Sequence, residues 1–121
     1  MKYLPLLILL CHQALSQRKI DTAEIINIGG IRQYIVVKGQ DISKPLLLFL
    51  HGGPGSSLMQ KADKITGRLQ QQFVVVHWDQ RETGQTLRLN KTSQPLTLQL
   101  FYSDTHDLID TLLRRFQHPK L

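Results

Sequence analysis

The clearest hydrophobic pattern in the chain is a run of five apolar residues, 46–50, that ends at a glycine-rich segment, residues 51–55. An uninterrupted apolar run of this length predicts a strand buried on both faces, as in a parallel sheet covered by helices. A second apolar run, residues 73–78, ends at a polar segment, residues 79–84. We expect a second strand there, with its loop at the same end of the sheet as the first loop.

A hairpin is predicted before these strands. Residues 25–28 and 31–37 are rich in β-branched side chains. Gly29 and Gly30 between them can take the positive φ values of a two-residue turn. A polar loop then leads to the strand at residues 46–50.

Two helices are predicted after the glycine-rich segment. Residues 58–71 place apolar side chains on one helical face, and Ser57 with Gln60 fits a capping box. A polar connection is expected over residues 86–95. The clearest helical pattern follows, with an apolar face that runs from Leu98 to Phe116.

The N-terminal residues predict a secretory signal peptide over residues 1–16, leaving a domain over residues 17–121 that is secreted or periplasmic. A positive start, a short apolar run and small residues before the cleavage point carry this prediction. The alternative is a hydrophobic strand or helix of the fold. The apolar run is much shorter than the roughly 20 residues of a membrane-spanning helix. Cys11, the single cysteine, lies inside the run, and its lipidation stays open.

The net charge of +6 does not predict a nucleic-acid site. Lysines and arginines occur as singles or pairs rather than in runs, and aromatic residues do not alternate with them. We interpret the charge as ordinary solvated surface. No metal site is expected either, because His77 and Asp79 have no third ligand at a convincing spacing.

The chain contains two motifs, each after a predicted strand: His51-Gly52-Gly53-Pro54-Gly55 after the first, and Trp78-Asp79-Gln80-Arg81 followed by Gly84 after the second. This pairing resembles the proline iminopeptidase family of α/β-hydrolases, serine peptidases that remove N-terminal residues. The resemblance covers about residues 25–121. It implies an α/β fold equal to the N-terminal portion of an α/β-hydrolase, with a β-hairpin and then a parallel β-loop-α-β-loop-α order, in which the sheet is incomplete.

The resemblance also implies roles for the first motif. A backbone N–H of Gly52 or Gly53 would donate to the oxyanion that forms during acyl transfer. Pro54 is commonly cis in the family, and His51 is expected to hold the loop in place rather than to act as the catalytic histidine. Gly55 completes the motif. The alternative is a glycine turn with a purely structural role.

In the second motif, Asp79 and Arg81 are expected to be structural partners that tie this loop to the first one, with Gly84 as part of the motif. Glu82 stands where the family usually has glycine, which leaves the backbone conformation of the loop open.

The family's nucleophile lies in a G-x-S-x-G motif, which does not occur among these 121 residues; Ser56, Ser57, Ser93 and Ser103 all lie outside such a motif. The triad acid, the triad histidine and the cap domain come later in the family. We therefore interpret the chain as a fragment of a serine hydrolase that needs no cofactor, acts on small peptides or esters in its full-length parent, and is inactive alone. The alternative is a small secreted interaction protein that binds a partner strand along an open sheet edge.

Overall fold

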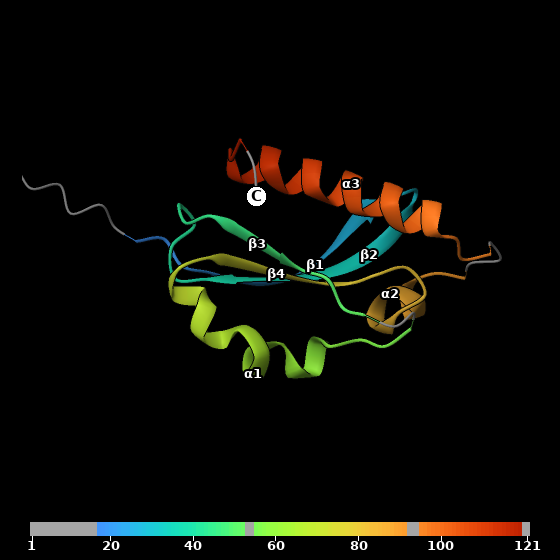
Figure 1. Cartoon of the computed structure of the whole chain (residues 1–121), viewed down its shortest axis with the longest axis horizontal. Coiled ribbons are helices and arrows are strands. Elements are labelled where there is room, and N and C mark those ends of the chain that lie inside the picture. Colours follow the sequence, from blue (N-terminus) through green and yellow to red (C-terminus); the bar gives the residue numbers. More distant parts are fainter. Residues whose placement is uncertain (1–16, 53–54, 92–94, 120–121) are drawn as a thin grey trace, which may run out of the picture.

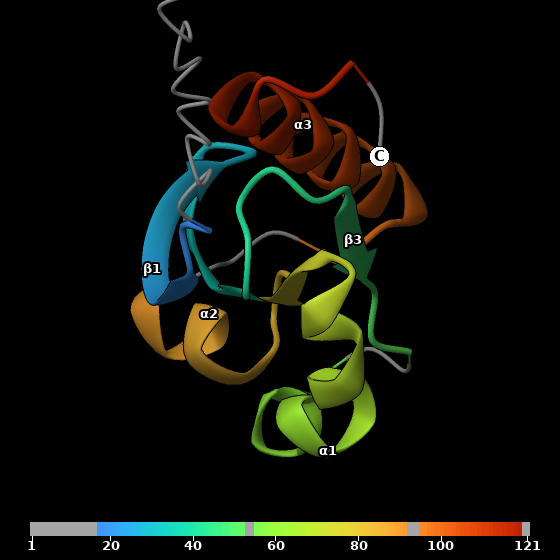
Figure 2. The same cartoon turned by 90° about the vertical axis from the view of Figure 1, so that its left-hand side faces the viewer.

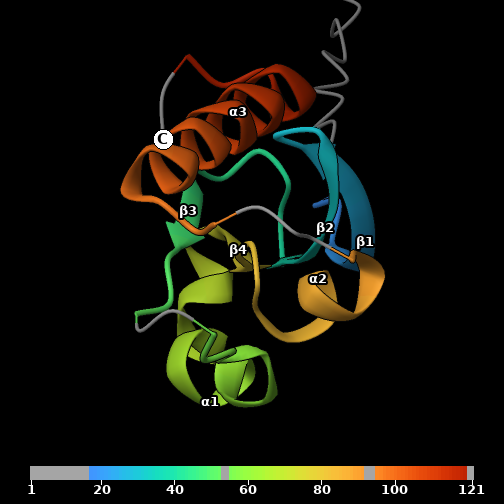
Figure 3. The same ribbon diagram turned by 90° about the vertical axis from the view of Figure 1, so that its right-hand side faces the viewer.

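The fold was analysed in a computed structural model, which describes residues 17–52, 55–91 and 95–119. These residues form a mixed α/β structure in which helices lie on both faces of a four-stranded sheet (Figure 1). The long helix α3 (Leu98–Phe116) covers one face, and α1 (Ala62–Thr66) and α2 (Gly84–Leu89) lie on the other side. The two side views, Figures 2 and 3, show the same layers.

The predicted hairpin is confirmed, and its strands are longer than predicted. Strands β1 (Ile20–Ile28) and β2 (Ile31–Gly39) pair antiparallel, with Ile28 opposite Ile31. Gly29 and Gly30 have φ values of 60° and 75°, the left-handed conformation that a tight hairpin turn requires. The first residues of β1 were not predicted because they include polar side chains and form no apolar run. Such a sequence is compatible with an edge strand, in which half-buried and exposed positions alternate.

Both predicted parallel strands are present. Strand β3 (Leu46–Phe49) pairs parallel to β4 (Val74–Asp79), and β4 also pairs antiparallel to β2, so the order is β1-β2-β4-β3. Every residue of β4 is buried, as expected for an inner strand. Within the described part of the chain, β3 pairs on one side only. Its predicted last residue, Leu50, lies beyond the strand and is 50% exposed.

The helix predicted over residues 58–71 is broken into three short pieces: the 3-10 helix η1 (Met59–Lys61), α1, and the 3-10 helix η2 (Gly67–Gln71). Thr66, at the second break, bonds its hydroxyl to the Ala62 carbonyl, a local bond that bends helices. The capping box is also wrong. Ser57 Oγ accepts a bond from the Met59 backbone, and neither Ser57 nor Gln60 forms the reciprocal pair.

Helix α3 agrees with the prediction in both bounds. Thr97 caps its start by accepting a bond from the Leu100 backbone N–H at 3.2 Å. Buried Leu108 and Leu112 pack against the sheet, in a core made by these residues: Ile28, Ile35, Val37, Leu46, Val74, Val76, Trp78, Leu108 and Leu112. None of the described helices is both long and apolar enough to cross a bilayer.

The polar connection expected over residues 86–95 overlaps helix α2, which begins at Gly84 and which the sequence pattern missed. No local side chain caps this helix; instead the Asp79 carboxylate accepts a hydrogen bond from the Gln85 backbone N–H at 2.9 Å. Thr86 is held by tertiary contacts as well, since its hydroxyl donates to the Asp79 carbonyl and accepts from the Tyr34 N–H. The helix therefore depends on bonds from neighbouring strands, which a local pattern does not contain.

Candidate functional site

The candidate site lies where β3 and β4 end. Because the two strands are parallel, the chain leaves both at the same edge of the sheet, and the segment beginning at His51 comes to lie beside residues 79–84. Of the glycine-rich motif, the structure describes His51, Gly52 and Gly55. Gly53, the second candidate oxyanion donor, and Pro54, with its expected cis bond, lie outside the described residues.

His51 and Gln80 join the two loops by two hydrogen bonds. The Gln80 backbone N–H donates to His51 Nε2 at 3.2 Å, and the Gln80 side-chain amide donates to the His51 carbonyl at 3.2 Å. The His51 side chain is buried, and its Nδ1 lies 3.4 Å from the Gly52 carbonyl. His51 therefore links the two loops through these hydrogen bonds.

Asp79 is a second connection between the two segments. Its carboxylate accepts from Ser57 Oγ at 2.5 Å and from the Gln85 N–H, and the side chain is buried. Gly84 packs directly against it with a φ of 49°, and a Cβ at this position would collide with the carboxylate. One Asp79 oxygen thus accepts from the Ser57 side chain and the other from the Gln85 backbone.

The middle of the second loop contacts the first loop through Thr83. Its hydroxyl accepts a bond from the Gly55 N–H at 3.2 Å, and Gly55 has a φ of 83°. Glu82, which stands where the resembled family has glycine, has a φ of 62°. The loop therefore keeps a glycine-like backbone conformation at Glu82, although a side chain there adds strain.

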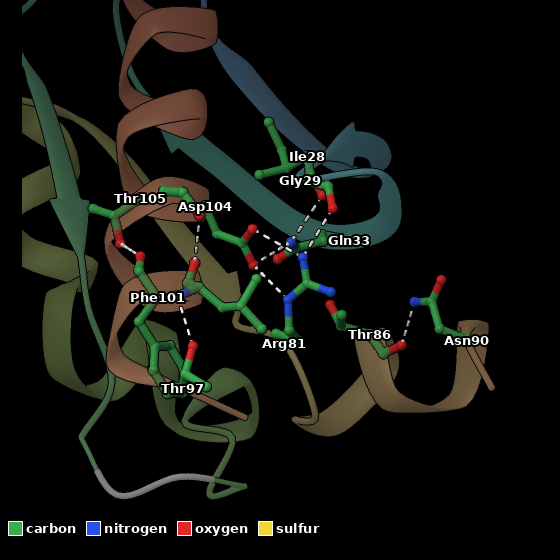
Figure 4. Close-up of polar contacts among 12 residues, drawn as sticks. Ile28, Gly29, Gln33, Arg81, Thr86, Asn90, Thr97, Phe101, Asp104 and Thr105 are labelled. Carbon is green, nitrogen blue, oxygen red and sulfur yellow. Dashed lines mark hydrogen bonds and ion pairs between the residues drawn. The ribbon is translucent and has the colours of Figure 1, made fainter. Parts of the chain in front are cut away.

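Among the described residues, the Arg81 side chain bonds Asp104 and Gly29 and not His51, Gly52 or Gly55 of the glycine-rich loop, with which it was expected to connect. Its Nε and Nη2 lie 2.9 Å from the two carboxylate oxygens of Asp104 on α3, and Nη2 also donates to the Gly29 carbonyl (Figure 4). Gln33 donates to both Asp104 and the Ile28 carbonyl. Arg81 therefore ties the second loop to α3 and to the hairpin turn.

Asp104 is the site residue that the sequence analysis missed. It lies four residues before Leu108 and eight before Leu112, so its side chain shares the buried stripe of α3 and is itself buried. A carboxylate on the apolar stripe of a helix is the signal that could have revealed it. The sequence alone does not show that the partner is Arg81, because the ion pair joins separate elements.

The other candidate side chains do not gather at this edge. Ser56 is exposed, Ser103 bonds its own helix at the Leu100 carbonyl, and Ser93 lies outside the described residues. His77 is buried beside Thr66, with Nε2 2.8 Å from the threonine hydroxyl, and loss of solvation lowers its pKa below the ordinary value. No group of three histidine, cysteine, aspartate or glutamate side chains in the described ranges could hold a metal ion.

An apolar groove of about 400 Å³ runs beside the site. It lies between the end of β3 and the first turns of α3, and these residues line it: Leu50, His51, Gln80, Leu98, Phe101, Tyr102 and Thr105. Three of them carry large side chains with exposures between 50% and 72%: Leu50, Tyr102 and Leu98. His51 and Gln80, which link the two loops, thus also line this apolar groove.

Comparison with known proteins shows a sequence likeness to a bacterial peptidase-like protein. The chain is 35% identical over 106 residues to a protein of Bacillus subtilis (strain 168) named probable aminopeptidase YbaC. The match covers 88% of this chain and 33% of the relative, so the chain spans about a third of the length of the curated relative it matches. No family model matches the chain.

Proposed function

We propose that the chain is the oxyanion-loop part of a peptidase-like serine hydrolase, of the proline iminopeptidase type in the α/β-hydrolase superfamily. The observation that carries the proposal is the joining of two motif loops at one sheet edge, where Gln80 holds His51 and Thr83 holds Gly55. The likeness to the probable aminopeptidase of Bacillus subtilis supports the same assignment.

The chemistry assigned to this part is one step of acyl transfer. Attack on a peptide carbonyl places negative charge on its oxygen, and backbone N–H groups fixed in advance stabilise that charge. Gly52 suits this role because a Cβ built on it would meet no atom within 4 Å, so a substrate carbonyl can approach the backbone. The nucleophile, the acid and the base would come from the remaining part of a protein of the relative's length.

The groove beside His51 would bind the substrate's N-terminal side chain. Its lining is mostly apolar, and its volume of about 400 Å³ suits a single small or medium side chain. The edge of β3 that has no partner strand in the described part of the chain would pair with the strand that leads to the nucleophile. The predicted signal peptide over residues 1–16 lies outside the described residues, and we propose a secreted or periplasmic location on its sequence pattern alone.

A chimera tests the proposed function. Residues 17–121 replace the matched segment of the Bacillus subtilis relative. The measurement is release of a chromogenic aniline from amino-acid anilides, the proline anilide included. We expect turnover by the chimera and by the intact relative, and none by the 121-residue chain alone. A folded but inactive chimera beside an active relative would contradict the proposal, as would turnover by the chain alone.

Matched glycine variants test the role of Gly52 in the same chimera. Gly52→Val keeps the backbone N–H but places a branched side chain where the substrate carbonyl has to approach it. The donor contact would then be lost, and kcat is expected to fall by about 10²-fold. Gly67→Val is the control, because a Cβ at Gly67 also meets open space but lies in η2, away from the loop. Equal effects of the two substitutions would remove the support for an oxyanion role.

A further inference from the structure

Gln80 donates two hydrogen bonds, and both go to a single residue 29 positions away, while its carbonyl accepts from the Thr83 N–H. Its backbone N–H and its side-chain amide each lie 3.2 Å from an acceptor of His51, one on the ring and one on the carbonyl. The side-chain bond is the informative one, because the His51 carbonyl belongs to the same peptide group as the Gly52 N–H.

A peptide group is planar, and its C=O and N–H point in opposite directions when the bond is trans. The described peptide bonds include no cis bond. A donor that holds the His51 carbonyl oxygen therefore also sets the direction of the Gly52 N–H. No hydrogen bond from that N–H to another described residue is present, and the space around Gly52 is open.

The His51 ring restrains Gly52 from its other side. The Gln80 backbone N–H is only a donor, so Nε2 of His51 is the acceptor and a neutral ring carries its proton on Nδ1. That Nδ1 lies 3.4 Å from the Gly52 carbonyl, a long and correspondingly weaker contact. Gln80 thus acts on Gly52 directly through one carbonyl and indirectly through the imidazole.

We propose that Gln80 is a positioning residue for the reaction, which aims the Gly52 N–H by holding the His51 carbonyl. The inference rests on the proposed function and names the residue that pre-organises its donor. Glycine has the widest backbone freedom, so an oxyanion donor on glycine needs such a restraint to be fixed before the reaction. A hydrogen bond accepted by the carbonyl also polarises the peptide and strengthens its N–H as a donor.

Nuclear magnetic resonance of the 121-residue chain tests the restraint without any activity. His51-Gly52 is the single His-Gly pair in the sequence, so ¹³C-carbonyl histidine with ¹⁵N-glycine marks this peptide group alone. In the native chain we expect a rigid Gly52 amide, with an order parameter near 0.85. In Gln80→Met we expect a value below about 0.6 and an upfield shift of the His51 carbonyl carbon.

Gln85→Met is the matched control. Gln85 is exposed, lies five positions along the same segment, and contacts Asp79 through its backbone N–H, so the same change removes no side-chain bond described here. Gln80→Glu keeps the side-chain shape but replaces the amide donor by a charged carboxylate that can only accept, and it serves as the second variant for folding. Unchanged Gly52 signals in both Gln80 variants, or equal changes in Gln85→Met, would overturn the proposal.

Kinetics in the chimera gives the second readout. After correction for the fraction of active protein, Gln80→Met is expected to lower kcat about 10-fold with KM within about 2-fold, because a misaimed donor is lost mainly in the transition state. Gln85→Met should leave both constants unchanged. A native chimera without turnover would reject the proposed function, while the Gly52 signals would still decide whether Gln80 holds the peptide.

Discussion

Arg81 and Asp104 form a two-point ion pair between the second loop and α3, with both N–O distances at 2.9 Å and both side chains buried. Gln33 joins the pair and also accepts from the indole N–H of Trp78 at 2.7 Å. The network connects the hairpin, the end of β4 and the long helix (Figure 4). It stabilises the edge of the sheet on which the candidate site lies.

Removal of one partner should be strongly destabilising. Asp104→Ala leaves the Arg81 guanidinium buried without its counter-charge, so we expect a loss of about 3–5 kcal/mol in the free energy of unfolding. Urea denaturation followed by the fluorescence of Trp78, the single tryptophan, measures it. Asp107→Ala, on the exposed face of the same helix, is the control and should change stability by less than about 0.5 kcal/mol. Comparable losses in both variants would contradict a special role for Asp104.

The two turn glycines should respond differently to alanine. Both have positive φ, so Gly30→Ala is expected to cost about 1 kcal/mol for the backbone conformation alone, since a Cβ there meets no atom within 4 Å. Gly29→Ala should cost at least about 2 kcal/mol more, because its Cβ would collide with the Asp104 carboxylate and separate the ion pair. Thermal unfolding of the two variants gives the comparison. Equal losses of stability in the two variants would show that the turn backbone can shift to accommodate the Cβ without separating Asp104 from Arg81.

Backbone strain at Glu82 should be measurable as a difference between two substitutions. Glu82→Ala and Glu82→Gly both remove the carboxylate with its interactions. Only glycine also removes the Cβ, which causes the backbone strain at a φ of 62°. We expect the glycine variant to be more stable than the alanine variant by about 1 kcal/mol in urea denaturation. An alanine variant equal to or more stable than the glycine variant would exclude this strain.

Stability should depend on pH through His77. Burial lowers the pKa of this imidazole below its ordinary value of 6.5, so between the two values the unfolded chain binds more protons than the folded one. The contribution of His77 is therefore fully present above pH 6.5 and is lost as the pH falls toward the lowered pKa. Urea denaturation between about pH 5 and about pH 8 should show this decline.

The matched variants for this pH dependence are His77→Gln and His106→Gln. The first removes the titrating group and should flatten the profile. The second removes an exposed histidine that lies beside Asp110 and should leave the profile as it is. Three carboxylates have lowered pKa values, and they start from ordinary values of 4.5 for Glu24 and 3.8 for Asp41 and Asp63, so they titrate below this range. A profile unaffected by His77→Gln would contradict the assignment.

The edge of β3 should make the 121-residue chain associate with itself. The strand is apolar and pairs on one side only in the described residues, and unpaired strand edges favour pairing between chains. Size-exclusion chromatography with light scattering should show concentration-dependent association that Leu50→Lys reduces. Leu87→Lys is the control, because Leu87 is 48% exposed, close to the 50% of Leu50, but lies on α2. A monodisperse native monomer at all concentrations would reject this expectation.

Most of the fold could be predicted because its signals are local. The Gly29-Gly30 turn, the apolar runs that became β3 and β4, and the periodic pattern of α3 each depend on neighbouring residues. The broken helix at Thr66, the capping box at Ser57 and the unpredicted α2 are failures. Bonds to other elements contribute to each of them: Thr66 contacts His77 on β4 besides its local bond to Ala62, Ser57 donates to Asp79, and α2 is capped by Asp79.

For the candidate site, the sequence by itself determined which residues follow the two parallel strands, because strand ends and glycine motifs are properties of the local chain. Only the tertiary structure decided how they pair. It paired Gln80 with His51, and it paired Arg81 with Asp104, which lies on a helix 23 positions further along. The physical reason is that a buried charge or an exposed peptide group takes whichever partner the packed sheet and helix bring within hydrogen-bond distance, and sequence separation places no limit on that choice.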